Sequence, residues 1–424
     1  MRQSPRSSTS PRTESAMPRL AAILLCGVAF VSHPAPAHAE DVPDPSPNAL
    51  RFPAAVKAGR PDAIKPGMRL TYSGTSATVS GQCILLALDS RGNWVVRETE
   101  KRWETGNSGG VGYTVVRVCH IDDEVAAVST SAYLLDLATN AVCAAANDGF
   151  VSQAGCAGTY WIHPAALAKL QDSKQAGQLV LRMPYVVNNR TYNAIRLTTE
   201  GAKSYTAQVF DLDTGILIFY AAASISDPSF VKLPNGQARK IEGSTHTETA
   251  GLMEVKDVGV PWRDRRAPTW VGTFEELRYE GSVSAVSNGA EYSQATSATI
   301  TPVARGEGWL RCSLASVTQN PGLPPYEVRG NLAAGNGSLG GLWIPPNGID
   351  DLEEGQVIET NDVTGTRTVV SRVANGLVTI TETGKIFQVD TTYDSKTGLM
   401  SEIVVSQQTA VGLRTTRLRL VGTK

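Results

Sequence analysis

The segment "WIPPNGIDDL" at residues 343–352 has a close relative in "WIHPAALAKL" at residues 161–170. In each segment Trp-Ile-x-Pro leads into apolar residues spaced three apart, which places them on one face of a helix. Proline suits the first turn of a helix, because the N–H that it lacks has no partner there. Each segment therefore predicts a short helix that begins beside a buried tryptophan and covers a sheet as a lid. The residues expected to form this lid, and to line a ligand pocket beneath it, are Trp161, Ile162, Leu167, Leu170, Trp343, Ile344, Ile349 and Leu352.

Other landmarks recur in the same order around the two segments. Chance supplies one such match but hardly an ordered set, so the sequence predicts a tandem duplication of one unit, with insertions mainly in the first copy. In the Asp-x-x-Thr-Gly landmark the aspartate bonds its own turn and the glycine adopts the left-handed conformation, which predicts a β-hairpin. The matched pairs are "FDLDTGILIFY" (210–220) with "YDSKTGLMSEI" (393–403), "TYSG" (71–74) with "RYEG" (278–281), Gly177-Gln178 with Gly355-Gln356, and "RGNW" (91–94) with "RGEGW" (305–309).

The duplication divides the chain into segments. We expect the first β copy at residues 66–257 and the second at residues 275–424. Residues 258–274 join them, and the two tryptophans of this linker predict packing between the copies rather than a free tether. Residues 40–65 are rich in proline and predict an extended lead-in.

Residues 1–39 have the features of a secretory signal peptide, with an apolar run at residues 20–30 and an Ala37-His38-Ala39 cleavage site. A compact signal that begins at Met17 indicates that translation starts there. The apolar run is too short for a membrane anchor, and no later segment reaches the ~18 apolar residues of a transmembrane helix. We therefore expect export to the bacterial periplasm or the extracellular space, with no transmembrane segment.

Composition narrows the fold and the function. The formal net charge is −1 and basic residues are dispersed, so nucleic-acid binding has no support. Valine and threonine are abundant and helical periodicity is rare, which favours β structure. We expect a mainly β fold of two tandem antiparallel curved-sheet domains, half-barrel-like, each with seven to nine strands and one short covering helix.

Five cysteines remain after the predicted cleavage. Cys143 and Cys156 bracket a loop of small residues and are the first candidates for a disulfide, and Cys83 with Cys119 on neighbouring predicted strands is the second. Cys312 would then be left as a buried thiol. The alternative is that all five simply fill the core, since unpaired cysteine is among the most buried residue types.

The sequence shows no catalytic constellation, metal site or cofactor motif. "GNGSLG" at residues 335–340 fits a dinucleotide-binding pattern, but it lacks the preceding strand and following helix that such a site needs, so we expect a flexible loop. His120, His163 and His246 have no spacing that would place two imidazoles on one metal ion. They are interpreted as structural or surface histidines.

The order of elements resembles the half-barrel carriers of the bacterial envelope, the lipoprotein-carrier LolA/LolB-like group. The resemblance depends on "FDLDTGIL" and "YDSKTGLM" as closing hairpins, on the short covering helix and on the export signal. It covers most of each copy in outline, whereas the carriers of that group have one unit. It implies a concave sheet that holds a lipid or a lipoprotein acyl chain.

Three functional hypotheses follow. The first is an exported, non-enzymatic protein that holds a hydrophobic or amphipathic ligand, such as a lipid or acyl chain, in a concave β-sheet. The second is a structural envelope protein with filled β domains that binds a protein partner, for which two like units would double the surface. The third is a secreted hydrolase whose site is assembled from residues far apart in the sequence.

Overall fold

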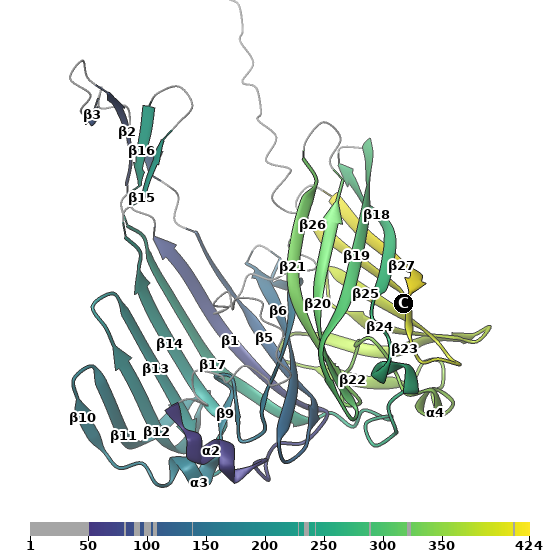
Figure 1. Ribbon diagram of the computed structural model, residues 1–424, viewed down its shortest axis with the longest axis horizontal. Coiled ribbons are helices and arrows are strands. Elements are labelled where there is room, and N and C mark those ends of the chain that lie inside the picture. Colours follow the sequence, from purple (N-terminus) through teal and green to yellow (C-terminus); the bar gives the residue numbers. More distant parts are fainter. Residues whose placement is uncertain are drawn as a thin grey trace, which may run out of the picture.

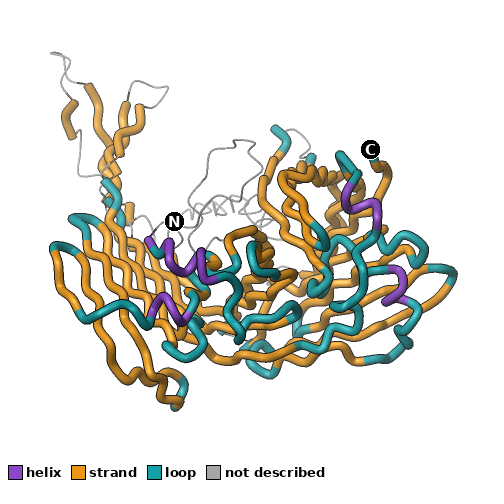
Figure 2. The backbone as a smooth tube through the Cα atoms, turned by 60° about the horizontal axis from the view of Figure 1, so that its bottom comes forward, coloured by secondary structure: helices purple, strands orange, loops and turns teal. Residues whose placement is uncertain are grey.

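Two large antiparallel sheets make up most of the protein, and a small sheet projects from the first of them (Figure 1). This confirms the expected mainly β fold with few, short helices (Figure 2). The predicted signal peptide lies outside the described residues. The computed structural model describes residues 51–79, 82–88, 94–96, 103–104, 108–137, 139–227, 229–232, 237–241, 243–287, 290–319, 324–409 and 412–424.

The first sheet has ten strands. Both of its edges are open, with the short strand β10 at one end and β7 at the other. In spatial order the strands are β10 (Ser173–Gln175), β11 (Gln178–Val187), β12 (Arg190–Glu200), β13 (Ser204–Asp211), β14 (Leu217–Ile225), β17 (Thr245–Asp257), β1 (Met68–Val79), β5 (Ser108–Ile121), β6 (Val125–Asp136) and β7 (Ala141–Gln153).

The second sheet also has ten strands, and it curves around its own core (Figure 1). Its edges are β21 and β22. In spatial order the strands are β21 (Tyr326–Gly335), β20 (Trp309–Thr318), β19 (Ala290–Gly306), β18 (Leu277–Ser287), β27 (Gly412–Thr423), β26 (Met400–Thr409), β25 (Phe387–Asp394), β24 (Leu377–Thr383), β23 (Thr366–Ala374) and β22 (Val357–Asn361).

The two sheets have the same topology. When the first is followed from β7 to β10 and the second from β21 to β22, each position holds the corresponding strand in chain order, and the first strand always lies beside the last. Each sheet has ten strands, which is more than the seven to nine expected. An identical order over ten strands, with a short helix between the fourth and the fifth, is the topology that a duplicated unit would produce.

The small sheet consists of strands inserted into the first copy. One insertion follows β1 and the other follows β14, and the two pair with each other through β2 and β16. Neither insertion has an equivalent in the second copy. The strands are β2 (Gln82–Leu88), β3 (Trp94–Val96), β4 (Trp103–Glu104), β15 (Ser229–Lys232) and β16 (Gln237–Ile241).

The core of each copy lies on one face of its large sheet, as the alternation along β20 shows. Leu310, Cys312 and Leu314 are buried, whereas Arg311 and Ser313 between them are more exposed. Alternate side chains of a strand point to opposite faces, so one face packs against the core and the other meets the surroundings. Each fully buried leucine contributes about 1.5–3 kcal/mol to stability.

Short helices lie where the Trp-Ile-x-Pro segments predict them. The helix α3 (Pro164–Leu167) and the helix α4 (Pro346–Ile349) each begin at the proline, which confirms its position in the first turn. In the first copy, strand β9 (Trp161–Ile162) pairs with β8 (Cys156–Ala157) just before α3. Each helix is only four residues long, so its position depends on tertiary contacts rather than on helix propensity.

Each Trp-Ile-x-Pro segment is docked on the Asp-x-x-Thr-Gly hairpin of its own copy. The Ile162 amide donates to the Gly215 carbonyl at 3.0 Å, and the Ile344 amide donates to the Gly398 carbonyl at 2.9 Å. Both glycines have positive φ, 76° and 71°. A Cβ on Gly398 would lie 2.0 Å from the Ile344 carbonyl oxygen, so this approach needs a residue without a side chain.

The tyrosine landmark reaches the same place. The Tyr72 hydroxyl donates to the Leu217 carbonyl at 3.0 Å, and the Tyr279 hydroxyl donates to the Met400 carbonyl at 2.9 Å. Both carbonyls lie two residues after the hairpin glycine. Three of the repeated landmarks therefore meet in one buried cluster in each copy.

Two other pairs of sequence landmarks do not occupy equivalent positions in the two copies, so they do not support the duplication. Gly177-Gln178 leads into β11, whereas Gly355-Gln356 precedes β22, which corresponds to β10. Trp94 begins β3 in the inserted sheet, whereas Trp309 begins β20 in the large sheet. Short matches of common turn residues arise easily, since glycine marks most turns.

The lead-in and the linker also differ from expectation. Within the expected extended lead-in over 40–65, the described part forms the helix α2 (Pro53–Ala58), and Ala55 and Ile64 are buried in the core of the first copy. In the linker, Trp262 is buried in the core of the second copy rather than between the copies. Trp270, in the helical turn η2 (Thr269–Gly272), stacks edge-on against Trp343 at 6.1 Å.

Neither predicted disulfide, Cys143 with Cys156 or Cys83 with Cys119, is formed by the described cysteines, and the side chain of Cys83 lies outside the described residues. Cys119, Cys143 and Cys312 are thiols, and Cys156 has no disulfide to any of them. Cys143 lies near the start of β7 and Cys156 follows its end, so a strand of about 3.3 Å per residue separates them by roughly 30 Å. A disulfide needs Cα atoms about 5.5 Å apart, and an extended strand between the cysteines excludes that.

We predict that Gly398→Ala destabilises the protein much more than Gly365→Ala. Both glycines have φ near +70°, but a Cβ on Gly365 would meet nothing within 4 Å. Gly365→Ala should cost about 1–2 kcal/mol for its left-handed backbone alone, and Gly398→Ala at least about 2 kcal/mol more because it displaces the docked segment. Urea unfolding followed by tryptophan fluorescence measures both, and equal losses would contradict the docking role.

Candidate functional site

A partly enclosed cavity of about 200 Å³ lies between the concave face of the second sheet and strands β6 and β7 of the first. Every strand of the second sheet except β22 contributes to its lining, and the segment 338–342 covers one side. Side chains two apart on one strand, such as Ile403 and Val405, both line it, so one face of the sheet forms the wall. The apolar wall includes Ile300, Leu314, Ile380, Val389, Val405 and Leu418.

The residues predicted to form a pocket and lid lie elsewhere. They pack in the two main cores, and none of them lines the cavity, although Leu342, next to Trp343, does. The ring N–H of Trp161 donates to the Ala154 carbonyl at 2.9 Å, and that of Trp343 donates to the Asn336 side chain at 3.2 Å. Seven are buried and Leu170 is half-buried: Trp161, Ile162, Leu167, Leu170, Trp343, Ile344, Ile349 and Leu352.

The two copies meet around the cavity through two apolar clusters. Strand β7 crosses β21 so closely that a Cβ on Gly149 would lie 2.0 Å from the Ala333 nitrogen. At the other side the rings of Tyr133 and Phe387 lie 5.9 Å apart. The clusters consist of Cys119, Ala127, Val151, Trp309 and Ala333, and of Val115, Tyr133, Val142 and Phe387.

The segment 335–340, expected to be a flexible loop, is packed at this boundary. The Gly337 amide donates to the Cys119 carbonyl at 2.7 Å, and a Cβ on Gly335 would lie 2.5 Å from the same oxygen. Its glycines therefore permit backbone contact between the copies, and the expectation of a flexible loop is wrong. The missing side chains are the physical reason for the glycine-rich pattern.

The polar end of the cavity is formed by Arg117 of β5, Tyr133 of β6 and Glu382 of β24. The Tyr133 hydroxyl donates to the Glu382 carboxylate at 2.6 Å. Burial raises the pKa of the Glu382 carboxyl, although the Arg117 charge and the tyrosine hydrogen bond act in the opposite direction. Burial also raises the pKa of Asp148, a second carboxyl in the lining.

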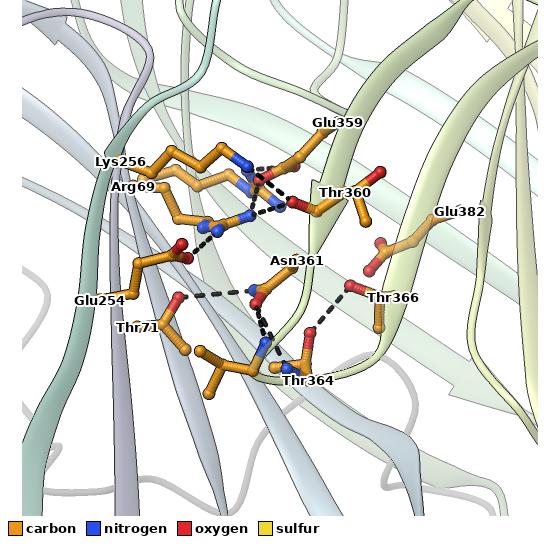
Figure 3. Close-up of polar contacts among 12 residues, drawn as sticks. Arg69, Thr71, Glu254, Lys256, Glu359, Thr360, Asn361, Thr364, Thr366 and Glu382 are labelled. Carbon is orange, nitrogen blue, oxygen red and sulfur yellow. Dashed lines mark hydrogen bonds and ion pairs between the residues drawn. The ribbon is translucent and has the colours of Figure 1, made fainter. Parts of the chain in front are cut away.

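Next to this end, buried charges join the copies (Figure 3). Glu359 of β22 forms ion pairs with Arg69 of β1 and, at 2.7 Å, with Arg117. Arg69, whose side chain is fully buried, also pairs with Glu254. The side chain of Lys256 donates to the Thr360 carbonyl at 3.1 Å. Two arginines of the first copy thus share one carboxylate of the second, and Glu254 supplies a further negative charge to Arg69, so the copies are linked by charges that have little access to water.

Sequence reasoning missed these residues, although a signal was present. Arg69 and Arg117 each stand between apolar residues in predicted strands, as in "VVRVC". Charged side chains are rarely fully buried unless they are paired, so a charge within an apolar strand indicates a partner elsewhere. The partner itself, Glu359, cannot be identified from sequence because it is 290 residues from Arg69.

Among the described residues, one hydroxyl in the cavity lining has no hydrogen-bond partner. Thr416 of β27 is buried, and its Oγ1 atom is unsatisfied in the structure. A buried hydroxyl without a partner costs roughly 1–3 kcal/mol, so a ligand that supplied the missing hydrogen bond would gain affinity.

The histidines take local structural positions. His163 caps the helix α3 by accepting from the Ala165 amide at 3.1 Å, and burial lowers its pKa. His120 contacts Asp122 at 3.1 Å and His246 contacts Thr78 at 2.9 Å. Within the described ranges, no group of three metal-binding side chains occurs. Over the same residues, no helix has the length and apolar character needed to cross a membrane.

The first copy contains an isolated buried carboxyl outside the cavity. Glu248 of β17 is only 4% exposed, and among the described residues it has no hydrogen bond or ion pair. Burial raises its pKa to about 7. Its charge in turn contributes to the raised pKa values of Tyr160 and Tyr220. This glutamate faces the core and takes no part in the contacts between copies.

Comparisons with known proteins leave the family open. No family model matches the chain, and no curated protein matches it. Among solved structures, the chain matches the crystal structure of a Nitrosomonas europaea protein provisionally named AttH at 11% identity, over 84% of this chain and 94% of that chain, with a TM-score of 0.11. So low a score carries no argument about fold or function. Of the resemblance to the lipoprotein carriers, the coarse feature of antiparallel sheets is present.

We predict that Glu359→Gln destabilises the protein by about 3–5 kcal/mol, because two buried arginines lose their shared counter-charge. Glu402→Gln is the matched control: Glu402 also contacts two arginines, Arg417 and Arg419, each at 2.5 Å, but those are exposed. It should cost less than about 1 kcal/mol. Equilibrium urea unfolding compares the two, and similar small losses would show that the buried pairs contribute little.

We predict that Glu248→Gln stabilises the protein at pH 8 and has no such effect at pH 4. The folded-state pKa of about 7 exceeds the ordinary value of 4.5, so the folded state binds the proton more tightly than the unfolded state. The free energy of unfolding therefore falls as the pH rises from 4.5 through about 7. The gain should be on the order of 1 kcal/mol after screening. Unfolding at the two pH values measures it, with the exposed Glu200→Gln as control, and an equal effect at both would contradict it.

Proposed function

We propose that this chain is an exported, non-enzymatic protein that binds a small amphipathic molecule in the cavity between its two sheets. The observation that carries the proposal is a partly enclosed, mostly apolar cavity with a few polar groups at one end. Sites for small molecules combine apolar walls with a small number of placed polar groups in this way. The predicted signal peptide supports export.

The size of the cavity limits the ligand. Its volume of about 200 Å³ is slightly above that of an engineered protein cavity of about 150 Å³ that binds benzene. It therefore suits a single ring or a short acyl chain. A longer lipid would extend through the open side, so the enclosed part recognises a short apolar segment rather than a whole lipid.

The wall also favours an amphipathic ligand over a purely apolar one. The polar groups of the lining include the unsatisfied Thr416 hydroxyl and the carboxyl groups of Glu382 and Asp148. An apolar ligand would leave the Thr416 hydroxyl without a partner and would remove the two carboxyl groups further from water, at a cost comparable to the gain from burying a few methylene groups. A ligand with a polar head satisfies both parts of the cavity.

A protein-partner function is the second candidate, and one observation favours it. An open apolar groove on the first sheet is lined by Val111 and Val186, which are 37% and 63% exposed, together with Tyr185 and Phe219. Exposed apolar surface of this kind is typical of interaction sites. A hydrolase would need a reactive pair, and the cavity carboxyl Glu382 is instead bound by the Tyr133 hydroxyl.

We predict that Ala298→Leu weakens binding of 1-hexanol at least tenfold, because the larger side chain fills the cavity that Ala298 lines. Ala295→Leu is the control, since Ala295 lies on the same strand but is exposed. Calorimetric titration of the full chain measures both. Equal affinities in the two variants would show that the binding site lies outside the cavity. If the unaltered protein does not bind 1-hexanol, the partner-binding function is favoured.

A further inference from the structure

The polar end of the cavity contains a carboxylate without a cation of its own. Glu382 lines the cavity and accepts a hydrogen bond from Tyr133, and it forms no ion pair in the part of the chain that the structure describes. Arg117, the cation beside it, is held by Glu359 at 2.7 Å. The cavity therefore contains a hydrogen-bond acceptor, the Glu382 carboxylate, whose nearest positive charge, on Arg117, is already paired with Glu359.

Charges around Glu382 decide which head group fits. The groups that face it are Arg117 from β5, Tyr133 from β6 and Glu359 from β22. Glu359 is also paired with Arg69, which in turn pairs with Glu254, so three carboxylates face two guanidinium groups. Burial adds a further cost to the ionised form of Glu382. A ligand carboxylate would bring a further negative charge into a poorly solvated site that already has more carboxylates than guanidinium groups, whereas a ligand cation would supply the missing counter-charge.

Geometry leaves room for such a cation beside an apolar body. Ile380 is two residues before Glu382 on β24, and both line the cavity, so the carboxylate and the apolar wall lie on one face. A ligand that lies along this face contacts apolar side chains with its body and the carboxylate with its head. Charge-assisted hydrogen bonds from an ammonium to a carboxylate are about twice as strong as neutral ones.

We propose that the cavity is selective for primary amines that carry a short apolar chain or a single ring, with the ammonium bound by Glu382. This inference rests on the proposed function and names its ligand class. An ammonium and a proton compete for the Glu382 carboxylate, because both bind to the same oxygen atoms. Binding therefore releases a proton at pH values where Glu382 is still protonated, while an amine stays charged up to about pH 10.

The test compares three probes with the same chain length: hexylamine, 1-hexanol and hexanoate. Calorimetric titration of the full chain should show hexylamine binding at least tenfold more tightly than hexanoate. Glu382→Gln should weaken hexylamine at least tenfold and change 1-hexanol less than about threefold. Glu402→Gln, which removes a carboxylate from the same sheet beside the cavity-lining Ile403, should leave all three affinities unchanged.

Each result discriminates. If hexanoate or 1-hexanol binds as tightly as hexylamine, the amine selectivity is wrong and the binding function stands. If none of the three binds, the binding function itself fails. If Glu382→Gln also loses affinity for 1-hexanol, the affinities of the unaltered protein are measured as a function of pH. The affinity for hexylamine should fall as acid protonates Glu382, and that for 1-hexanol should not. A parallel pH dependence of the two affinities would overturn the proposal.

Discussion

The docking of each Trp-Ile-x-Pro segment on the Asp-x-x-Thr-Gly hairpin is the contact on which each copy depends. It joins the middle of each ten-strand copy to a late hairpin through two backbone hydrogen bonds, one of them at a glycine where no side chain fits. Helices of four residues cannot hold such a position by themselves. The buried tryptophan packs at the same contact, and the tyrosine hydroxyl from the first strand binds a carbonyl of the hairpin, so both stabilise the docked segment.

Local patterns in the sequence were sufficient for the parts of the fold that local chemistry determines. The prolines of the lid segments begin helices, and the glycines of both hairpins have positive φ. Matches of common turn residues misled, as at Gly355. The cysteine spacing misled as well. Cys143 and Cys156 are close in sequence, but an extended strand between them keeps them far apart in space.

The candidate site was beyond sequence reasoning for a different reason. Its wall is one face of a whole sheet and its polar end joins Arg117 to Glu382 and Glu359, which belong to the other copy. No periodicity connects residues so far apart. The predicted lid residues share the chemistry of a pocket, but the same apolar character serves a filled core, and only packing distinguishes the two.

The cavity has one wall from each half of a duplicated chain, and this has an evolutionary consequence. A lone ancestral unit would have left its concave face open to water. In this chain the strands β6 and β7 of the first copy cover the cavity of the second sheet, so the two copies hold unequal positions. Different demands on the two copies would explain why the sequence repeat is clearest at the buried contact between segment and hairpin, which both copies need in the same form.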